Sequence, residues 1–474
     1  MTIGVRVALS LITALALGHF AATLFLLGHG SCLRRRLLRF GFSVPLGFGL
    51  VSFTYFIQRL VWAPSFASLL AGDAVMVACL AAASRFRSRR RSAQPAEHAC
   101  EDSRFGVEFW LLGTLTALLV ATSVATFLVR SIPNPSGYYD AWANWNMKAK
   151  FLFTPDGSRW RGLFDAAAPH PGYPLFLPCT VARAWTYAGC ETPAAPIAMA
   201  FVATFSVVFL LFGAVLLLRG RTAALLGASV LLATSSFREV GRHQYADIPF
   251  ALFTLGLGVV LLLVAGGDRD REYGLIGLAG LLSSMAAWTK NEGFLVGLAF
   301  LPCLLVAVPR ASHGRARIAG VWLAAALPGL AIVILAKAQA AAPVDLFASR
   351  DWGAALHLLS VARLELIGKH VFGALLPAAG GQPLWLWLLD PVVLLGTACL
   401  AFGFDARRAF SRRMAPVLWM VLLVGAGYVA VYVITPHDLE WHLRTSASRL
   451  WMHLWPLVLC WACASVGRPA PPLG

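Results

Sequence analysis

The sequence predicts an all-α protein that crosses a membrane about thirteen times. The chain has 474 residues, of which 59% are hydrophobic and 13% are charged. Its mean hydropathy is +0.72. A water-soluble fold of this length could not cover so much apolar surface with polar groups. Lipid is therefore the expected solvent for most of the chain.

The predicted spans are apolar runs close to the roughly 20 residues that a helix needs to cross a bilayer. Two runs, 222–236 and 273–288, are short, which allows tilted, broken or partly re-entrant helices. The complete set of runs is 5–28, 40–60, 66–83, 109–130, 194–217, 222–236, 246–265, 273–288, 290–308, 318–338, 385–404, 414–434 and 449–466.

The placement of arginine predicts the orientation. The net charge is +17, and the arginines gather in every second segment between apolar runs. This is the positive-inside pattern of a membrane protein, and it does not indicate a nucleic-acid partner. It predicts a multi-pass protein of a bacterial inner membrane with its N-terminus outside and its C-terminus inside. The arginine clusters are Arg34–Arg39, Arg85–Arg91, Arg219 with Arg221, Arg269 with Arg271, Arg310–Arg317 and Arg407–Arg413.

Four regions follow from this pattern. Residues 1–84 form a three-helix extension, 85–108 a basic cytoplasmic linker, 109–340 the main membrane module, and 341–474 an outer loop with three further helices. The segments expected outside are 131–193, 237–245, 289–292, 339–384 and 435–448. Cys179 and Cys190 fall in the first of these, where an oxidising periplasm would allow a disulfide, but the sequence does not decide whether one forms.

The first outer segment places an acid among aromatic residues. Asp140 follows the run at 109–130, and an interfacial aromatic belt with a solvated acid is the alternative to a functional site. The candidate binding residues near it are Tyr139, Trp142, Lys148, His170 and Tyr173.

A second acid, Asp247, lies at the outer end of the run at 246–265, after Arg242 and His243. His243 and Asp247 would share a helical face if the helix began early. Pro249 suits the first turn of a helix and favours a start close to Asp247 instead. An acid near a helix N-terminus can also be a structural cap.

Two later outer segments supply cations. Lys290 and Glu292 lie in a tight turn that could also be an ordinary polar turn. The segment 435–449 is dense in ionisable residues, which could bind a phosphate head group or could pair with Asp438 and Glu440 and anchor a helix. Its candidate binding residues are His437, His442, Arg444 and Arg449.

Together these segments suit transfer of a sugar from a lipid phosphate. An inverting displacement needs a base near the acceptor hydroxyl and positive charge for the departing phosphate. Aromatic rings could stack on a sugar. The expected partners are therefore a polyprenyl-phosphate sugar donor, a lipid or glycan acceptor, and the surrounding membrane lipid.

At this point the sequence resembles the GT-C superfamily, the multi-spanning glycosyltransferases that use polyprenyl-phosphate sugars and include protein mannosyltransferases and aminoarabinose transferases. Their acidic motifs in the first and second outer loops correspond to Asp140 and Asp247, and residues 170–175, His-Pro-Gly-Tyr-Pro-Leu, resemble their His-Pro-rich segment. The usual Asp-Glu pair of the first motif is Asp140-Ala141 here. The resemblance covers roughly 109–340, with about seven helices as in the shared GT-C module.

The resemblance implies that Asp140 is the general base and that Asp247 is a supporting or metal-binding acid. Lys290, Arg242, Arg444 and Arg449 become candidates for the donor phosphate. No cofactor is fixed by the sequence, although a divalent metal is possible. The alternatives are an O-antigen ligase or polymerase, favoured by the 435–449 segment, and a lipid or solute transporter, for which Asp73 is the clearest acid within a span.

Overall fold

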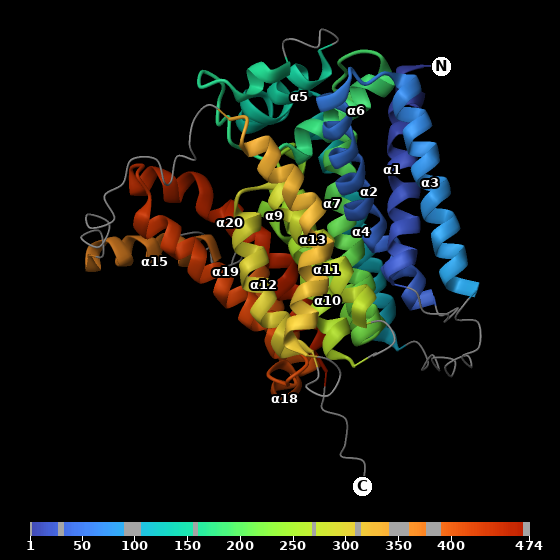
Figure 1. The fold of residues 1–474 in the computed structure, drawn as a ribbon. Coiled ribbons are helices and arrows are strands. Elements are labelled where there is room, and N and C mark those ends of the chain that lie inside the picture. Colours follow the sequence, from blue (N-terminus) through green and yellow to red (C-terminus); the bar gives the residue numbers. More distant parts are fainter. Residues whose placement is uncertain are drawn as a thin grey trace.

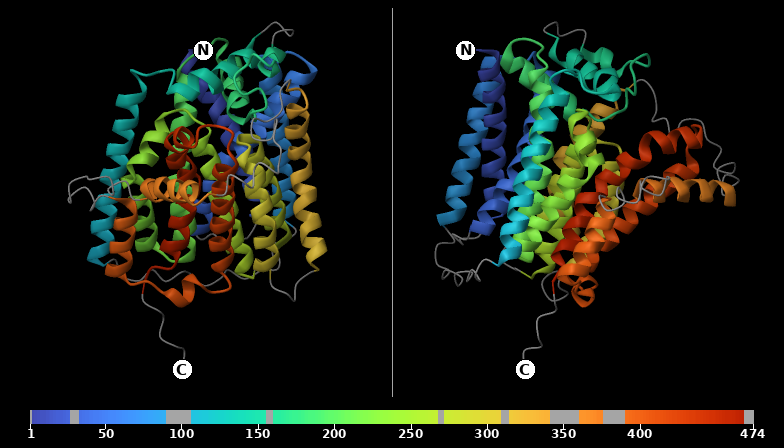
Figure 2. Two further views of the ribbon diagram at one scale, coloured as in Figure 1. Left: turned by 90° about the vertical axis from the view of Figure 1, so that its left-hand side faces the viewer. Right: turned by 180° about the vertical axis from the view of Figure 1, so that it is seen from behind.

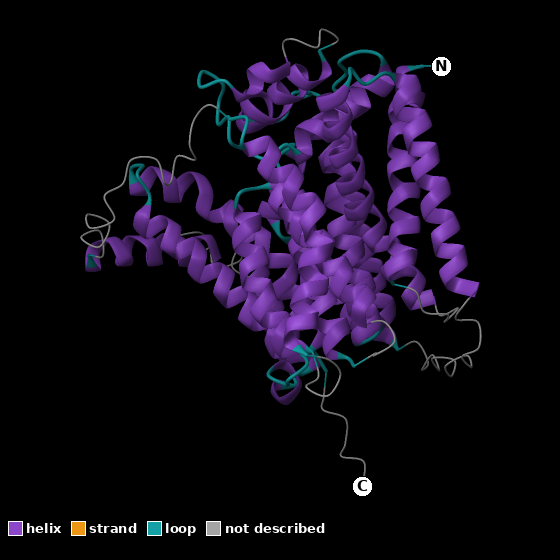
Figure 3. Ribbon diagram, viewed as in Figure 1, coloured by secondary structure: helices purple, strands orange, loops and turns teal. Residues whose placement is uncertain are grey.

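A computed structural model describes residues 2–26, 33–89, 106–154, 160–267, 272–308, 314–340, 360–375 and 390–467. The described chain is built from helices, and no strand is found within it (Figure 3). The predicted all-α class is confirmed. Of the predicted regions and clusters, the following lie outside the described residues: residues 90–105 of the linker, residues 341–359 and 376–389 of the C-terminal region, Arg269, Arg271 and Arg310.

The helices follow one another along the chain, and many neighbours within the described ranges are joined by short turns (Figure 1). Their bounds are α1 Ile3–Phe25, α2 Leu33–Val61, α3 Phe66–Arg89, α4 Val107–Ser131, η1 Ala141–Trp145, α5 Asn146–Phe153, η2 Trp160–Phe164, α6 Phe176–Ala188, α7 Ala194–Leu218, α8 Arg221–Ala233, α9 Ser235–Arg242, α10 Asp247–Ala265, α11 Glu272–Thr289, α12 Glu292–Ala307, α13 Arg315–Lys337, α15 Val361–Leu375, α17 Pro391–Phe402, α18 Ala406–Ala409, α19 Ala415–Ile434 and α20 Leu439–Ala464.

Eight described helices are long and apolar enough to cross a membrane, namely α1, α2, α3, α4, α7, α10, α13 and α19. Helices α8 and α9 together make a ninth candidate that bends by 66°. The chain is thus a multi-pass membrane protein. Each of the thirteen predicted runs overlaps a helix, but α12 and α17 are short, with 16 and 12 residues. The number thirteen therefore stays a prediction.

The first two helices pack backbone against backbone. A Cβ added to Gly18 of α1 would collide with the Ser43 carbonyl of α2, and one added to Gly47 would collide with the Ala14 carbonyl. Helix α2 also reaches the centre of the bundle. There the Ser52 hydroxyl donates to the Phe176 carbonyl at 2.9 Å and accepts from the Trp288 indole at 2.8 Å. The first three helices therefore share one packed core with α6 and α11.

A buried ion pair joins α3 to α6. Asp73 pairs with Arg183, and the two side chains are 3% and 1% exposed. The Arg183 guanidinium also donates to the Ser10 hydroxyl at 2.8 Å and the Thr13 hydroxyl at 2.7 Å, and the Tyr187 hydroxyl donates to Asp73. The mid-span acid that motivated the transporter alternative is thus neutralised by Arg183 and accepts two hydrogen bonds.

The segment 131–193 is more structured than a loop, since it contains η1, α5, η2 and α6, which form a layer over one end of the bundle (Figure 1). Its helix α6 is almost wholly buried because the aromatic and aliphatic side chains pack on α1 and α2. Cys179 is buried in α6, and both Cys179 and Cys190 are free thiols. The disulfide left open by the sequence is not formed.

Different elements lie at the two ends of the bundle. Helix α1 begins at the end covered by α5 and α6, whereas α18 lies at the opposite end (Figure 1). At that opposite end Arg219 donates to the Val466 carbonyl and Arg408 donates to the Leu218 carbonyl at 2.8 Å. Helices α15, α19 and α20 lean away from one side of the bundle (Figures 1 and 2).

Candidate functional site

The chain leaves the helical form between α9 and α10, and α10 then begins in the interior of the protein. Helix α9 ends at Arg242 and α10 begins at Asp247, so His243 and Asp247 do not share a helix. Gln244 adopts a left-handed backbone with φ of 61°. Its side-chain oxygen accepts from Asn146 at 3.0 Å, and its amide donates to the Pro135 carbonyl at 3.1 Å. These bonds hold the layer that carries Asp140 against the start of α10.

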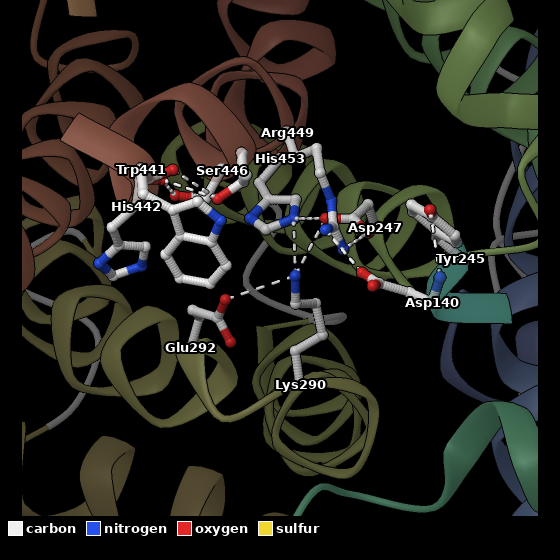
Figure 4. A network of polar contacts seen from close by, with 11 residues as sticks. Asp140, Tyr245, Asp247, Lys290, Glu292, Trp441, His442, Ser446, Arg449 and His453 are labelled. Carbon is white, nitrogen blue, oxygen red and sulfur yellow. Dashed lines mark hydrogen bonds and ion pairs between the residues drawn. The ribbon is translucent and has the colours of Figure 1, made fainter. Parts of the chain in front are cut away.

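Asp247 is the centre of the polar network drawn in Figure 4. Its carboxylate is completely buried. One oxygen accepts from the Lys290 ammonium at 2.9 Å and lies 2.9 Å from Nε2 of His453, while the other accepts from Arg449 at 2.9 Å. The Tyr428 hydroxyl lies 3.0 Å from Nδ1 of His453. Two cations thus hold this carboxylate ionised inside a low-dielectric environment.

Asp140 lies at the opposite side of the same arginine. Arg449 donates to Asp140 at 2.7 Å, and the two side chains are 24% and 33% exposed. The Asp140 backbone amide donates to the Tyr245 hydroxyl at 3.3 Å. The Arg449 guanidinium lies 4.6 Å from the centre of the Tyr245 ring, as in a cation–π contact. Burial raises the pKa of Tyr245 to about 12, so it stays protonated at neutral pH.

Arg449 therefore joins the two acids that the sequence analysis singled out, although they are separated by more than a hundred residues. Lys290 extends the network to Glu292, with a nitrogen–oxygen distance of 3.4 Å. The side chains of Asp140, Asp247, Lys290, Arg449 and His453 converge from different parts of the fold (Figure 4). This arrangement pairs an accessible carboxylate with cations that are already positioned.

A second group of predicted residues surrounds the 170–173 turn. The His170 ring stacks on Tyr173 with centroids 4.4 Å apart. The fully buried Lys148 donates to the His170 carbonyl at 2.6 Å, and Lys337 donates to the Gly172 carbonyl at 2.9 Å. Burial and the nearby Lys337 ammonium lower the pKa of Lys148 to about 7. These lysines fasten the turn rather than join the Asp247 network.

Helix α9 and its C-cap residue hold two other candidates away from Asp247. Arg242 pairs with Glu239, and Nε2 of His243 lies 3.8 Å from the same carboxylate. The His243 ring stacks on Tyr138 at 4.3 Å. Burial and the adjacent Arg242 lower the pKa of His243 to about 4, so it is neutral at neutral pH.

The remaining candidates lie at the edge of the site. Tyr139 and Trp142 are 65% and 53% exposed and pack edge to face on each other at 5.1 Å. His442 bonds to the Thr435 hydroxyl at 2.8 Å, and the His437 ring packs on the His442 ring at 5.8 Å. Arg444 is exposed and makes no polar contact with the network among the described residues.

Three residues of the site, His453, Tyr428 and Tyr245, were not predicted from the sequence. His453 follows Arg449 by four residues in α20, so both share one helical face. A histidine four residues after an arginine in an otherwise apolar run was therefore a usable signal. No comparable pattern marked Tyr428, whose role depends on the packing of α19 against α20.

The donor set does not fit a resident divalent metal. No group of three or more His, Cys, Asp or Glu side chains with metal-binding geometry occurs in the part of the chain that the structure describes. Both Asp247 oxygens already contact Lys290, His453 or Arg449, and Asp140 contacts Arg449. A metal ion would have to displace these cations.

Comparison with known proteins found no matching protein family, no similar curated protein and no similar solved structure. The geometry of the network is therefore the basis for a functional assignment.

Proposed function

We propose that this protein transfers a sugar from a polyprenyl-phosphate donor to a lipid or glycan acceptor at the outer face of a bacterial inner membrane. The observation that carries the proposal is the position of Arg449 between Asp140 and Asp247, with Lys290 beside it. Lipid-phosphate sugar transfer needs a carboxylate and fixed positive charge close together at a membrane boundary. The resemblance of the two acidic segments to the GT-C glycosyltransferases agrees with this proposal.

Each residue then has a defined task. The partly exposed Asp140 takes the proton from the acceptor hydroxyl as that oxygen attacks the anomeric carbon. Arg449 and Lys290 bind the donor phosphate and stabilise its charge as the sugar–phosphate bond breaks. Asp247, which is fully buried, is a positioning residue that holds both cations in place. The exposed Tyr139 and Trp142 offer rings for stacking on sugar.

Replacement of Asp140 tests the base. Asp140→Asn is nearly isosteric, and we expect it to insert and fold but to lose transfer by a factor of about 10² to 10⁴. The assay is release of polyprenyl phosphate from a panel of polyprenyl-phosphate hexoses and pentoses by purified protein in vesicles that contain total membrane lipid as acceptor. Asp438→Asn is a matched control, because Asp438 is exposed and caps α20, and asparagine also caps helices.

Three outcomes would contradict parts of the assignment. Activity close to wild type in Asp140→Asn would exclude Asp140 as the base and make Asp247 the leading candidate. Unchanged activity in both Asp140→Asn and Asp247→Asn, with lipid flipping lost in either, would indicate a transporter. Reporter fusions after residues 155 and 440 should both read outside, and a cytoplasmic signal at 155 would overturn the orientation.

A polysaccharide ligase or polymerase is the second candidate. It is favoured by α20, which carries His442 and supplies Arg449 and His453 to the network, and His437 lies just before this helix. Such an enzyme would use a lipid-pyrophosphate donor, which carries a second phosphate. Comparing polyprenyl-phosphate and polyprenyl-pyrophosphate sugars in the same vesicle assay distinguishes the two, because we expect turnover of the monophosphate donor.

A further inference from the structure

A cavity of about 130 Å³ lies on another side of α9, between α4, α7 and the bend that separates α8 from α9. Arg449, Lys290 and Asp247 do not line it. Its walls combine aromatic and aliphatic side chains with arginines and hydroxyls. The lining residues are Ser123, Thr126, Phe127, Thr204, Phe205, Leu232, Ser235, Phe237, Arg238, Glu239 and Arg242.

The cavity carries an excess of positive charge. It is lined by two arginines and one glutamate, and Arg242 is paired with that glutamate. Arg238 has no acidic partner in the described part of the chain, and its buried Nε makes no hydrogen bond there. A partly buried arginine without an acidic partner favours contact with an anion or water.

Two further polar groups of the cavity lack partners. Ser123 of α4 is 5% exposed, and its buried hydroxyl makes no hydrogen bond within the described residues. Helix α9 begins at Ser235, which lines the cavity, and no side chain caps this helix start. Free amide groups at a helix N-terminus favour a phosphate group.

The position of the cavity suits a molecule that is partly apolar. Ser123 lies eight residues before the end of α4 at Ser131, which corresponds to about 12 Å along the helix. Helix α4 buries few of its own side chains, so it is the lipid-facing wall. The backbone leaves the helical form at Thr234, directly before Ser235 of the cavity wall.

We propose that this cavity binds the phosphate head group of a membrane lipid, with Arg238, the Ser123 hydroxyl and the start of α9 on the phosphate. The acyl chain then runs along Phe127 and Phe205, between α4 and α7. The assignment does not depend on the proposed sugar transfer, because it uses none of the residues of the Asp247 network.

The test measures lipid retention by the full chain. Protein purified from vesicles of phosphatidylglycerol in phosphatidylcholine is examined by native mass spectrometry, which gives the number of bound phosphatidylglycerol molecules and an apparent Kd. We expect Arg238→Gln to weaken the tightest site by about tenfold or more, since one charge-assisted contact is lost. Ser123→Leu should do the same by filling the cavity, and it adds no charge to a spanning helix.

Arg130→Gln is the matched control. Arg130 is an exposed arginine at the end of α4, the helix that carries Ser123, and it does not line the cavity. Equal retention in wild type, Arg238→Gln and Ser123→Leu would overturn the proposal. So would an equal loss in Arg130→Gln, which would indicate general surface charge. If inorganic phosphate bound as tightly as phosphatidylglycerol, the cavity would be a site for free phosphate and the lipid proposal would be wrong. If either Arg238→Gln or Ser123→Leu fails to fold, the lipid retention of the other variant still tests the proposal.

Discussion

Two buried aspartates in this protein have opposite surroundings. Asp73 pairs with one arginine, and that arginine also donates to two hydroxyls of α1. Asp247 meets Lys290, Arg449 and His453, and Arg449 continues outward to the partly exposed Asp140. A closed pair satisfies its own charges and can only hold helices together. A network that ends at an accessible carboxylate has charge to offer a ligand.

Breaking the closed pair should have the largest effect on stability. Arg183→Ala leaves Asp73 buried without its cation, which should lower the stability of the folded protein by about 3–5 kcal/mol. The measurement is thermal unfolding of detergent-purified protein. The double variant Asp73→Leu with Arg183→Met should recover most of this loss and keep transfer activity. Lost activity in a stable double variant would show that the pair has a role beyond packing.

Removing the charge of Asp247 should have a smaller effect on stability and a larger one on function. Asparagine at position 247 can still form hydrogen bonds. In the Asp247→Asn variant, Arg449 is still paired with Asp140, and Lys290 is still paired with Glu292. We expect a loss of about 1–3 kcal/mol and little remaining sugar transfer. The same unfolding assay, combined with donor binding, separates the two effects. A stable, fully active variant would place Asp247 with the structural acids.

Lys148 differs from both aspartates, because it is a buried ionisable group that pairs with no group of opposite charge among the described residues. Its pKa is lowered to about 7 from an ordinary value of 10.5. Between these values the unfolded chain binds the extra proton, so the contribution of Lys148 to stability rises with pH from about 7 upward and is least below pH 7. Lys148→Met should flatten the pH dependence of unfolding above pH 7. An unchanged profile would mean that Lys148 titrates normally.

His243 should give the smallest effect. Its pKa of about 4 keeps the ring neutral at neutral pH, and the ring stacks on Tyr138. His243→Phe preserves the stack, so stability should change by less than about 0.5 kcal/mol and transfer should remain. A strong loss of transfer with normal folding would make the imidazole part of the reaction.

The sequence predicted the positions of the apolar helices and brought Asp140, Asp247, Lys290 and Arg449 into one candidate set, because charged residues next to spans are rare and conspicuous. It did not separate Arg444 from Arg449. The two are five residues apart in α20, so they point in directions about 140° apart at 3.6 residues per turn. When Arg449 faces Asp247, Arg444 faces away from it. The rotation of α20 about its own axis, which decides this, depends on how α20 packs against its neighbours.

Contacts between distant segments were beyond the sequence as well. Arg183 lies 110 residues from Asp73, and no local pattern pairs them. The burial of Lys148 and the folding of 131–193 into α5 and α6 also depend on tertiary packing, since polar and aromatic residues there suit an exposed loop equally well.

The contact of α1 with α2 also bears on how the chain assembles during synthesis. Gly18 and Gly47 let these consecutive helices meet along their backbones, and Ser43 and Ala14 lie directly at the contact. Small residues at such a crossing allow association by close packing alone, without help from later helices. The pair can therefore form a hairpin while the ribosome is still making the rest, and α2 then offers its remaining face as a template for α6 and α7. A bulky residue at position 18 would disturb the packing of this helix pair, which forms without the polar network.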